Sequence, residues 1–380
     1  EAEWWAKDGV AVTEAKLREL GLLDDVKYAR INELVSTSVV NASQRLTSTV
    51  PGGNALQIRE ELWPDPATVD HGVVGDLSEL RDKQFIDHGD LAGMETQRMK
   101  LVNAASDVLV RAMERDPTII MFGEDVHKMR GGVSGMTKGV IENFPDRIMP
   151  MPIAENGFTG VALGAALNGL RPVAEIMFGD FCFTAADQIA HGAGKVKHMF
   201  GGDFPVPVVM RVRIAPHTGY GSQHSCDPSA LFGLFPGWRI FSPTNAFDYI
   251  GMMNAALSCN DPVAIIEHVG LYQHASEVPK DNLDYCIPFS TAHVVREGSA
   301  CTVVATSAML GKSLKAIEET GIDAELIDLR NIDHHGIDWA CLEQSIAKTG
   351  RVILAEETTT ALALSGRWAA EIQERFFDML

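Results

Sequence analysis

The sequence predicts an α/β protein with two domains built on mainly parallel sheets, preceded by a helical tail and an extended linker. From Met99 onward, short apolar runs alternate with stretches of helical spacing, a pattern typical of strands joined by helices. The alternation stops before Pro288, in a segment with Pro, Asp and Asn, and then begins again. This restart predicts a second, smaller α/β domain.

The first 97 residues lack this alternation. Apolar residues such as Ile31 and Leu34 recur at helical spacing between positions 9 and 47, which predicts helices. Residues 49–97 are rich in Asp and Pro and show little periodicity, which indicates an acidic linker or an extended wrapping arm. Residues 1–97 together carry 18 acidic and nine basic side chains, so they are more acidic per residue than the rest of the chain.

The elements expected in the two domains follow from apolar runs and helical spacing. In the first domain they are a helix at 100–115, a strand at 119–122, a strand at 171–178, a helix from about 184 to 199, and strands at 206–212 and 262–267. In the second domain they are strands at 300–307, 324–329 and 351–355, and helices at 310–320, 337–347 and 365–380. Strands in such an arrangement bind ligands beyond their C-terminal ends.

Composition excludes several classes of protein. The formal net charge of −19 over 380 residues argues against binding to nucleic acid, whose phosphates attract stripes of Lys and Arg. No run of 18 or more apolar residues occurs, so no membrane span is expected. The six cysteines are scattered without a CxxC pair, which favours free thiols in a reducing compartment over disulfides or a zinc site.

Glu155 is the first candidate for chemistry. It precedes an otherwise apolar helical stretch in which Gly160 and Gly164 share one face. A bland interpretation is also open, namely a core helix with Glu155 as a solvated acid near the helix dipole. If the carboxyl group were buried, desolvation would raise its pKa, and the group could hold or pass a proton.

Two further segments carry candidate residues. Phe181 follows a predicted strand and could stack on a flat ring, although a core position is the more frequent role for such a residue. His224 lies in a Gly-rich loop that suits an acid–base imidazole, but it is one of twelve histidines. Ser225 beside it does not indicate a serine hydrolase, since the chain has no GxSxG elbow.

Taken together, these segments resemble the β-type subunit of the thiamine-diphosphate-dependent decarboxylating component of 2-oxo acid dehydrogenase complexes, over about residues 98–380. The motifs that carry the resemblance are Phe122-Gly-Glu-Asp-Val126, Gly131-Gly-Val, Thr137-Lys-Gly139, Pro152-Ile-Ala-Glu, Gly157-Phe, Asp187-Gln-Ile, Lys195, Gly201-Gly, Gln223-His-Ser, Pro236-Gly and Asp261-Pro-Val. Ile327-Asp-Leu-Arg330, Lys348-Thr-Gly-Arg351 and Glu356-Glu resemble the transketolase-like C-terminal domain of that family. The resemblance implies two transketolase-like domains, a pyrimidine-binding domain at 98–285 and an apparently truncated C-terminal domain at 286–380.

The resemblance also implies roles for individual residues. Glu155 matches the acid that hydrogen-bonds the aminopyrimidine of thiamine diphosphate and so activates the cofactor. Phe181 and Ile153 fall at positions that contact the cofactor, and His224 matches the active-site histidine that acts on the substrate adduct. Glu124 matches an acid near the pyrimidine, either in a proton path between paired sites or in a structural ion pair.

Half of the cofactor site is absent from the sequence. No Gly-Asp-Gly motif for Mg²⁺ and diphosphate occurs, so no metal ligand is expected in this chain, and both groups are expected on an α-type partner. Residues 1–48 resemble the end of such an α subunit, through Trp4-Trp, Lys7-Asp8 and Leu20-Gly-Leu-Leu23. The chain is therefore interpreted as a fragment of a fused α–β protein, with 49–97 as the acidic linker.

The expected function is oxidative decarboxylation of a 2-oxo acid, of pyruvate or branched-chain type, with acyl transfer to the lipoyl group of an acyltransferase partner. Acetoin dehydrogenase and a split transketolase are the alternatives, and a non-catalytic scaffold is a third. The family's usual Gln-His-Ser-Gln is Gln223-His-Ser-Cys here, which leaves the substrate open. A two-fold homo-oligomer is expected, in the cytoplasm of a bacterium or in the mitochondrial matrix of a eukaryote.

Overall fold

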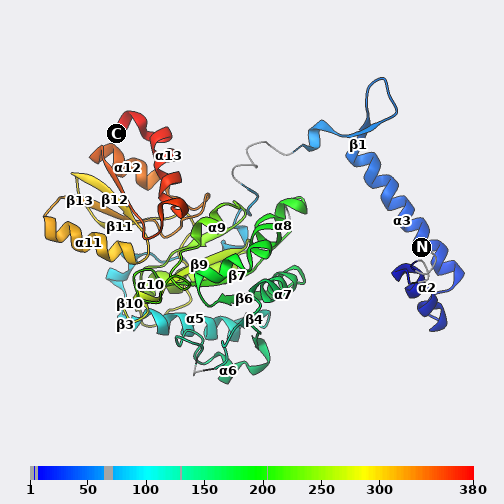
Figure 1. Cartoon of the computed structure of the whole chain (residues 1–380), viewed down its shortest axis with the longest axis horizontal. Helices are drawn as coiled ribbons and strands as arrows, with labels where there is room; N and C mark the ends of the chain where they lie inside the picture. The colour runs from blue at the N-terminus through cyan, green and yellow to red at the C-terminus, as the bar shows by residue number, and fades with distance from the viewer. Residues whose placement is uncertain (1–3, 5–6, 64–71, 129–130, 203) are drawn as a thin grey trace. The chain divides into compact units, whose positions relative to one another are not determined.

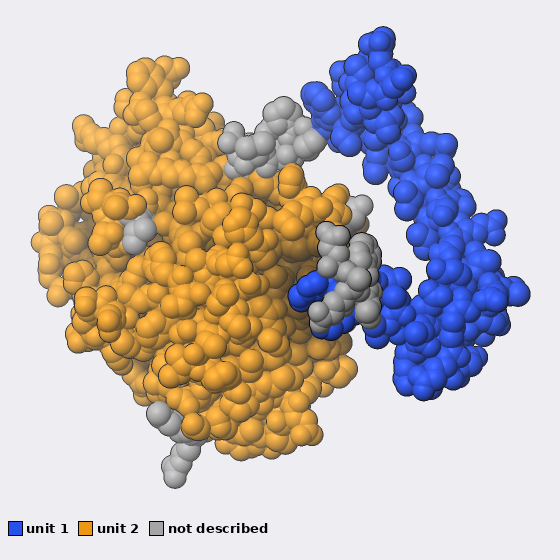
Figure 2. Space-filling view, turned by 45° about the vertical axis from the view of Figure 1, so that its right-hand side comes forward, with its two compact units in different colours: residues 1–67 blue, residues 68–380 orange. Residues whose placement is uncertain are grey.

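The computed structural model describes the chain except residues 1–3, 5–6, 64–71, 129–130 and 203 (Figure 1). Trp5 and part of the expected linker therefore lie outside the described residues. The chain forms two compact units, residues 1–67 and residues 68–380, which Figure 2 distinguishes by colour.

The first unit is helical, as its apolar spacing predicts. Helix α2 (Gly9–Glu19) begins after Asp8, and α3 (Asp25–Leu46) begins after Asp24. In each case the Asp carboxylate accepts backbone N–H bonds of the first turn, which stabilises the helix start. An antiparallel hairpin of β1 (Thr47–Thr49) and β2 (Leu56–Ile58) follows. Neither helix contains a buried residue, so the unit has no core of its own in these helices.

The larger sheet of the second unit has six strands in the order β5-β4-β6-β7-β9-β8, and all its pairings are parallel. The strands are β4 (Ile119–Gly123), β5 (Ile148–Pro150), β6 (Arg171–Ile176), β7 (Val209–Ile214), β8 (Arg239–Phe241) and β9 (Val263–His268). The four strands predicted for this domain are confirmed, with ends that differ by up to about three residues. Strands β5 and β8 were not predicted, because three residues are too few to establish a period.

Both faces of this sheet are covered by helices. The helices are α5 (Leu101–Arg115), α6 (Val140–Asn143), α7 (Glu155–Leu167), α8 (Gly194–Met199), α9 (Ser229–Gly233) and α10 (Ala246–Ser258). Alternate residues of β4 show the division, since Ile119 and Met121 join the core with α5 and α10, whereas Ile120 and Phe122 join the core with α7. A sheet buried on both faces is the expected consequence of its continuous apolar strands.

The smaller sheet has the order β11-β13-β12-β14. Its strands are β11 (His293–Arg296), β12 (Cys301–Ala305), β13 (Ala324–Asp328) and β14 (Val352–Ala355), and its helices are α11 (Ala308–Thr320), α12 (Trp339–Thr349) and α13 (Ser365–Phe376). All six elements predicted here are confirmed, and β11 is an additional antiparallel edge strand. Side chains of this domain, such as Ile327 and Trp368, share one core cluster with α7 and β6, so the two sheets belong to one compact unit.

The segment before β3 (Thr96–Lys100) belongs to the second unit and packs on its larger sheet domain. The backbone N–H of Gly75 donates to both carboxylate oxygens of Asp261, at 2.8 and 2.9 Å, and Arg239 donates to the Gly75 carbonyl at 2.8 Å. Asp261 is fully buried and also pairs with Lys197. Strand β3 then pairs with β10 (Ala275–Pro279), so this stretch is fixed at both ends.

The single helix expected from about 184 to 199 is not a continuous α-helix in the structure. The chain forms a 3₁₀-helix at Gly179–Phe183, then a π-helix at Gln188–Ala193, and only then α8. The backbone is closely packed at two glycines in and after the π-helix. A Cβ on Gly192 would lie 2.6 Å from Leu163, and one on Gly194 would lie 2.8 Å from Phe235. Such π-turns are frequent at functional sites.

Among the described residues, no helix is both long and apolar enough to cross a membrane. The same residues contain no group of three or more His, Cys, Asp or Glu side chains that could hold a metal ion.

Candidate active site

The candidate residues gather at one edge of the larger sheet. Because its strands are parallel, their C-terminal ends lie together, and Glu124, Phe178 and Thr218 come shortly after β4, β6 and β7. Glu155 begins α7, after the short strand β5. This edge is where open α/β sheets bind their ligands.

Glu124 and Glu155 form a pair of buried carboxyl groups. Glu155 is only 7% exposed and Glu124 8%, so Glu155 is not the solvated helix-end acid of the bland interpretation. Burial, and then the nearby charge of Glu155, raise the pKa of Glu124 from 4.5 to about 7. Its Oε1 atom has no hydrogen-bond partner among the described residues. Glu124 is therefore protonated in about half of the molecules at pH 7.

The surface around α7 is largely apolar and open. Ile153, two residues before the helix, is 85% exposed. Gly160 faces the π-helix, where a Cβ would lie 3.2 Å from Gln188 Oε1, while nothing lies within 4 Å of a Cβ at Gly164. The face of α7 that carries the two glycines is thus packed against the π-helix at Gly160 and open at Gly164.

Phe181 and His224 meet in an aromatic cluster centred on Phe178. The ring of His224 lies 4.6 Å from that of Phe178 and 5.4 Å from that of Phe181, edge to face in both cases. The Arg213 guanidinium lies 4.9 Å from the Phe178 ring centre, and its Nη2 has no partner among the described residues. Phe181 is half-buried, so one part of it packs on the core and another part is accessible.

A clamp ties the Phe181 segment to the His224 loop. The carboxylate of Asp180 accepts the backbone N–H of Cys226 at 2.9 Å. A Cβ on Gly179 would lie 2.4 Å from the Cys226 carbonyl oxygen and 2.7 Å from Pro228, so the two backbones are in direct contact there. The relative position of Phe181 and His224 is therefore set by residues one or two positions from each.

The buried thiol of Cys182 shows that the carboxyl pair is close to this clamp. Its pKa is raised well above the ordinary value, first by burial and then by the charges of four neighbours, namely Cys226, Asp227, Asp180 and Glu155. The structure thus brings Glu124, Glu155, Phe181 and His224 into one neighbourhood.

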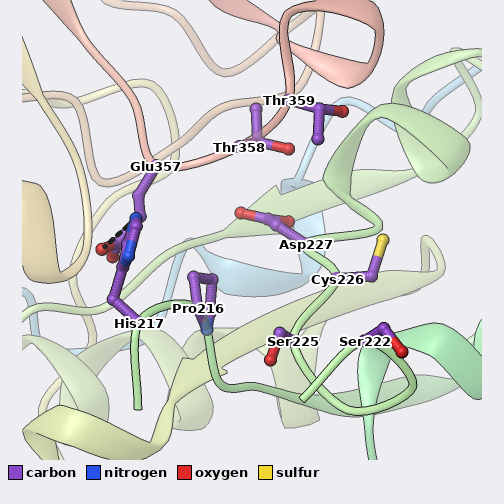
Figure 3. Close-up of a pocket in the computed structure, with 9 residues that line it drawn as sticks. All are labelled: Pro216, His217, Ser222, Ser225, Cys226, Asp227, Glu357, Thr358 and Thr359. Carbon is purple, nitrogen blue, oxygen red and sulfur yellow. Dashed lines mark ion pairs between the residues drawn. The ribbon is translucent and has the colours of Figure 1, made fainter. Parts of the chain in front are cut away.

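A cavity of about 460 Å³ adjoins the His224 loop (Figure 3). Ser222 and Cys226 line it from the loop, and Glu357 and Thr358 line it from the chain that follows β14. Burial raises the pKa of Asp227 in this cavity to about 6, although hydrogen bonds from Ser229 oppose the shift. The sequence analysis did not select Asp227 or Thr358, and the only signal was their position after strand ends.

Comparisons with known proteins agree with this geometry. The family described as the transketolase pyrimidine-binding domain matches residues 97–274, and the transketolase C-terminal domain matches residues 290–380. A solved structure, "Split gene transketolase, inactive beta4 tetramer", matches with a TM-score of 0.59 and 25% identity, and covers 73% of this chain and 86% of that one.

Three curated relatives share about a third of their residues with this chain. The acetoin:2,6-dichlorophenolindophenol oxidoreductase subunit beta of Cupriavidus necator is 33% identical, over 75% of this chain and 86% of its own length. The pyruvate dehydrogenase E1 component subunit beta-1 of Arabidopsis thaliana is 35% identical, over 75% and 79%. The 2-oxoisovalerate dehydrogenase subunit beta of Bacillus subtilis is 36% identical, over 74% and 86%. The chain thus belongs to the transketolase-like family of 2-oxo acid dehydrogenase E1 β subunits.

Proposed function

We propose that this chain is the β part of a thiamine-diphosphate-dependent enzyme that decarboxylates a 2-oxo acid and passes the acyl group to a lipoyl group. The observation that supports this most directly is the buried pair of Glu124 and Glu155 beside Phe181 and His224, in which burial and the charge of Glu155 raise the pKa of Glu124 to about 7. An acid kept protonated at neutral pH is what a ring nitrogen needs as a hydrogen-bond donor.

Each residue has a proposed task. The Glu155 carboxyl group hydrogen-bonds the aminopyrimidine ring nitrogen, and the raised pKa of Glu124, about 7, lets that neighbouring group supply a proton near neutral pH. The accessible part of Phe181 and the exposed side chain of Ile153 offer apolar surface to the flat ring. His224, held by the clamp at Cys226, stabilises or protonates the substrate at the carbonyl oxygen.

The residues of this chain fit the pyrimidine half of thiamine diphosphate. Two buried carboxyl groups, one of them with a pKa of about 7, and a half-buried aromatic ring match a flat heterocycle. The cofactor supplies the carbanion chemistry that breaks the bond to the carboxylate carbon. We place Mg²⁺ and the diphosphate on an α-type partner, with a lipoyl acyltransferase as acceptor.

We also propose that residues 1–48 belong to such an α-type part, that 49–97 is the linker, and that 98–285 and 286–380 are the pyrimidine-binding and C-terminal domains. The division of the chain near residue 67 and the family matches at 97–274 and 290–380 support this organisation. An upstream reading frame with a Gly-Asp-Gly motif would be the expected finding, and a separate gene for the α-type subunit would argue against fusion.

Acetoin is a second candidate substrate. Two curated relatives at 33% identity, from Cupriavidus necator and Bacillus subtilis, are named as acetoin oxidoreductase β subunits. The cavity beside His224 is mainly apolar but includes the polar side chains of Ser222, Asp227 and Thr358, which could hydrogen-bond a small substrate that carries a hydroxyl group.

The test is a substrate panel on the chain combined with its α-type partner, with 2,6-dichlorophenolindophenol as electron acceptor. Pyruvate, a branched-chain 2-oxo acid and acetoin are compared with and without thiamine diphosphate and Mg²⁺. Glu155→Gln is expected to lower kcat by at least about 100-fold, because it removes the carboxyl group that we propose hydrogen-bonds the ring nitrogen. The exposed Glu142→Gln serves as the matched control. Unchanged kcat in Glu155→Gln would refute the assigned role.

A further inference from the structure

A second cavity, of about 560 Å³, lies between the two sheets of residues 68–380. Its walls come from chain segments that follow strands, with Thr218 after β7, Asn245 after β8, Gly270 after β9 and Ser307 after β12. The C-terminal ends of the strands in both sheets therefore contribute to it. This is the position at which α/β sheets bind ligands.

The smaller sheet has its topological switch point at this cavity. Strand β12 lies between β13 and β14, and both pairings are parallel. The chain passes from β12 through α11 to β13 on one side, and then returns to β14 on the other side. The crevice beyond the end of β12, where Ser307 lies, is where such a sheet accepts a ligand.

The side chains that line the cavity favour an anion. Lys312 and Lys315 come from α11. His268 ends β9 of the larger domain, and His217 and His274 come from its loops. No Asp or Glu is among the described residues that line it. Cationic and imidazole donors that converge on one cavity are the usual means of holding phosphate groups.

The start of α11 adds a second, independent indication. Ser307 lines the cavity, is only 9% exposed, and its Oγ has no hydrogen-bond partner among the described residues. A buried hydroxyl without a partner costs free energy, so it points to a group that is bound in the cavity. Ser307 also precedes a 13-residue helix without making a side-chain cap, so the positive end of the helix dipole adds to the attraction.

One carboxylate lies close to this cavity. Glu357 pairs with Lys312 and lies 3.2 Å from His268 and 3.7 Å from His217, but it lines the neighbouring cavity instead. An anion would therefore be held on the side of Ser307 and Lys315. Lys315 is 75% exposed, and its pairing with Glu319 among the described residues is long, at 3.6 Å, so its charge is available.

We propose that this cavity binds a small phosphate-bearing anion, a phosphate monoester, at the start of α11, apart from the thiamine diphosphate site. The phosphate oxygens accept hydrogen bonds from the Ser307 hydroxyl, and Lys315 neutralises part of their charge.

The test is a titration of the full chain, without thiamine diphosphate, with inorganic phosphate and separately with methyl phosphate, followed by ³¹P line broadening. We expect saturable binding at one site per chain. Ser307→Ala is expected to weaken binding about tenfold, because a hydrogen bond to a charged group is lost. Lys315→Gln is expected to weaken binding about threefold, and this loss should shrink in high salt.

Lys16→Gln is the matched control, since Lys16 is also an exposed helical lysine paired with a glutamate one turn away, but in the first unit. It should bind phosphate as the unaltered chain does. Absence of saturable binding, or equal affinities in the three variants, would overturn the proposal. Since no cofactor, substrate or partner takes part, these outcomes are independent of the decarboxylase activity.

Discussion

Replacing Glu124 by Gln should stabilise the fold at alkaline pH and leave it almost unchanged at acidic pH. Glutamine has the shape and the polarity of the protonated carboxyl group but cannot ionise. The pKa of Glu124 is about 7 in the folded chain, against an ordinary value of 4.5, because the group is buried and lies near the charge of Glu155. The folded state therefore binds this proton more tightly than the unfolded state does.

The size of the effect follows from that difference in pKa. Where the folded state binds more protons, the free energy of unfolding falls as pH rises, here between about pH 4.5 and pH 7. A difference of about 2.5 pKa units corresponds to roughly 3 kcal/mol. Allowing for some solvent access around the carboxyl group, we expect Glu124→Gln to gain about 2 kcal/mol at pH 8 and less than about 1 kcal/mol at pH 5.

Thermal unfolding of the full chain at pH 5 and pH 8 measures this directly. For a unit of this size, the gain at pH 8 corresponds to a rise in Tm of about 4 °C. Glu142→Gln is the control, since Glu142 is exposed, and its Tm should follow that of the unaltered chain at both pH values. An equal change in Tm at pH 5 and pH 8 would show that the effect of Glu124→Gln does not come from a buried proton.

Three further outcomes are expected. Asp180→Ala should lower kcat about tenfold in steady-state assays, because it removes the acceptor for the Cys226 N–H. Asp180→Asn keeps an acceptor and should restore most of the rate. A loss in both variants would contradict the positioning role. Asp248→Asn should lower the free energy of unfolding in urea by about 3–5 kcal/mol, since Arg330 is fully buried against it, and a loss below 1 kcal/mol would count against this pairing. Gly179→Ala should lower activity, because its Cβ would displace the backbone at Cys226, while the circular dichroism spectrum stays that of the folded chain. Full activity would show that the contact can relax.

The fold was largely predictable where an element has a clear period. Strand β4 alternates between two cores at Ile119 and Ile120, and its apolar run was visible in the sequence. Helix α10 was missed because it is buried all round, with twelve buried residues, and so shows no amphipathic spacing. The π-helix at Gln188–Ala193 depends on packing across the chain, which local sequence does not encode.

The sequence could name candidate residues for the site one by one, but not their electrostatics. The position of Glu155 before a glycine-containing helix was visible in the sequence, whereas its burial and the raised pKa of Glu124 appear only in the folded chain. The cavity beside His224 was missed because its walls, at Asp227 and Thr358, lie far apart in the sequence and meet only through the two sheets.

The contact between Gly75 and Asp261 also has a consequence for synthesis on the ribosome. The two residues are 186 positions apart, so at about 5–20 residues per second the segment around Gly75 waits roughly 10–40 s before its acceptor is made. During that time the segment remains undocked, and so does Glu79, whose carboxylate accepts the Asn260 N–H in the folded chain. Closure of this contact is thus a late event in folding of the nascent chain, after the strands between the two residues have been made.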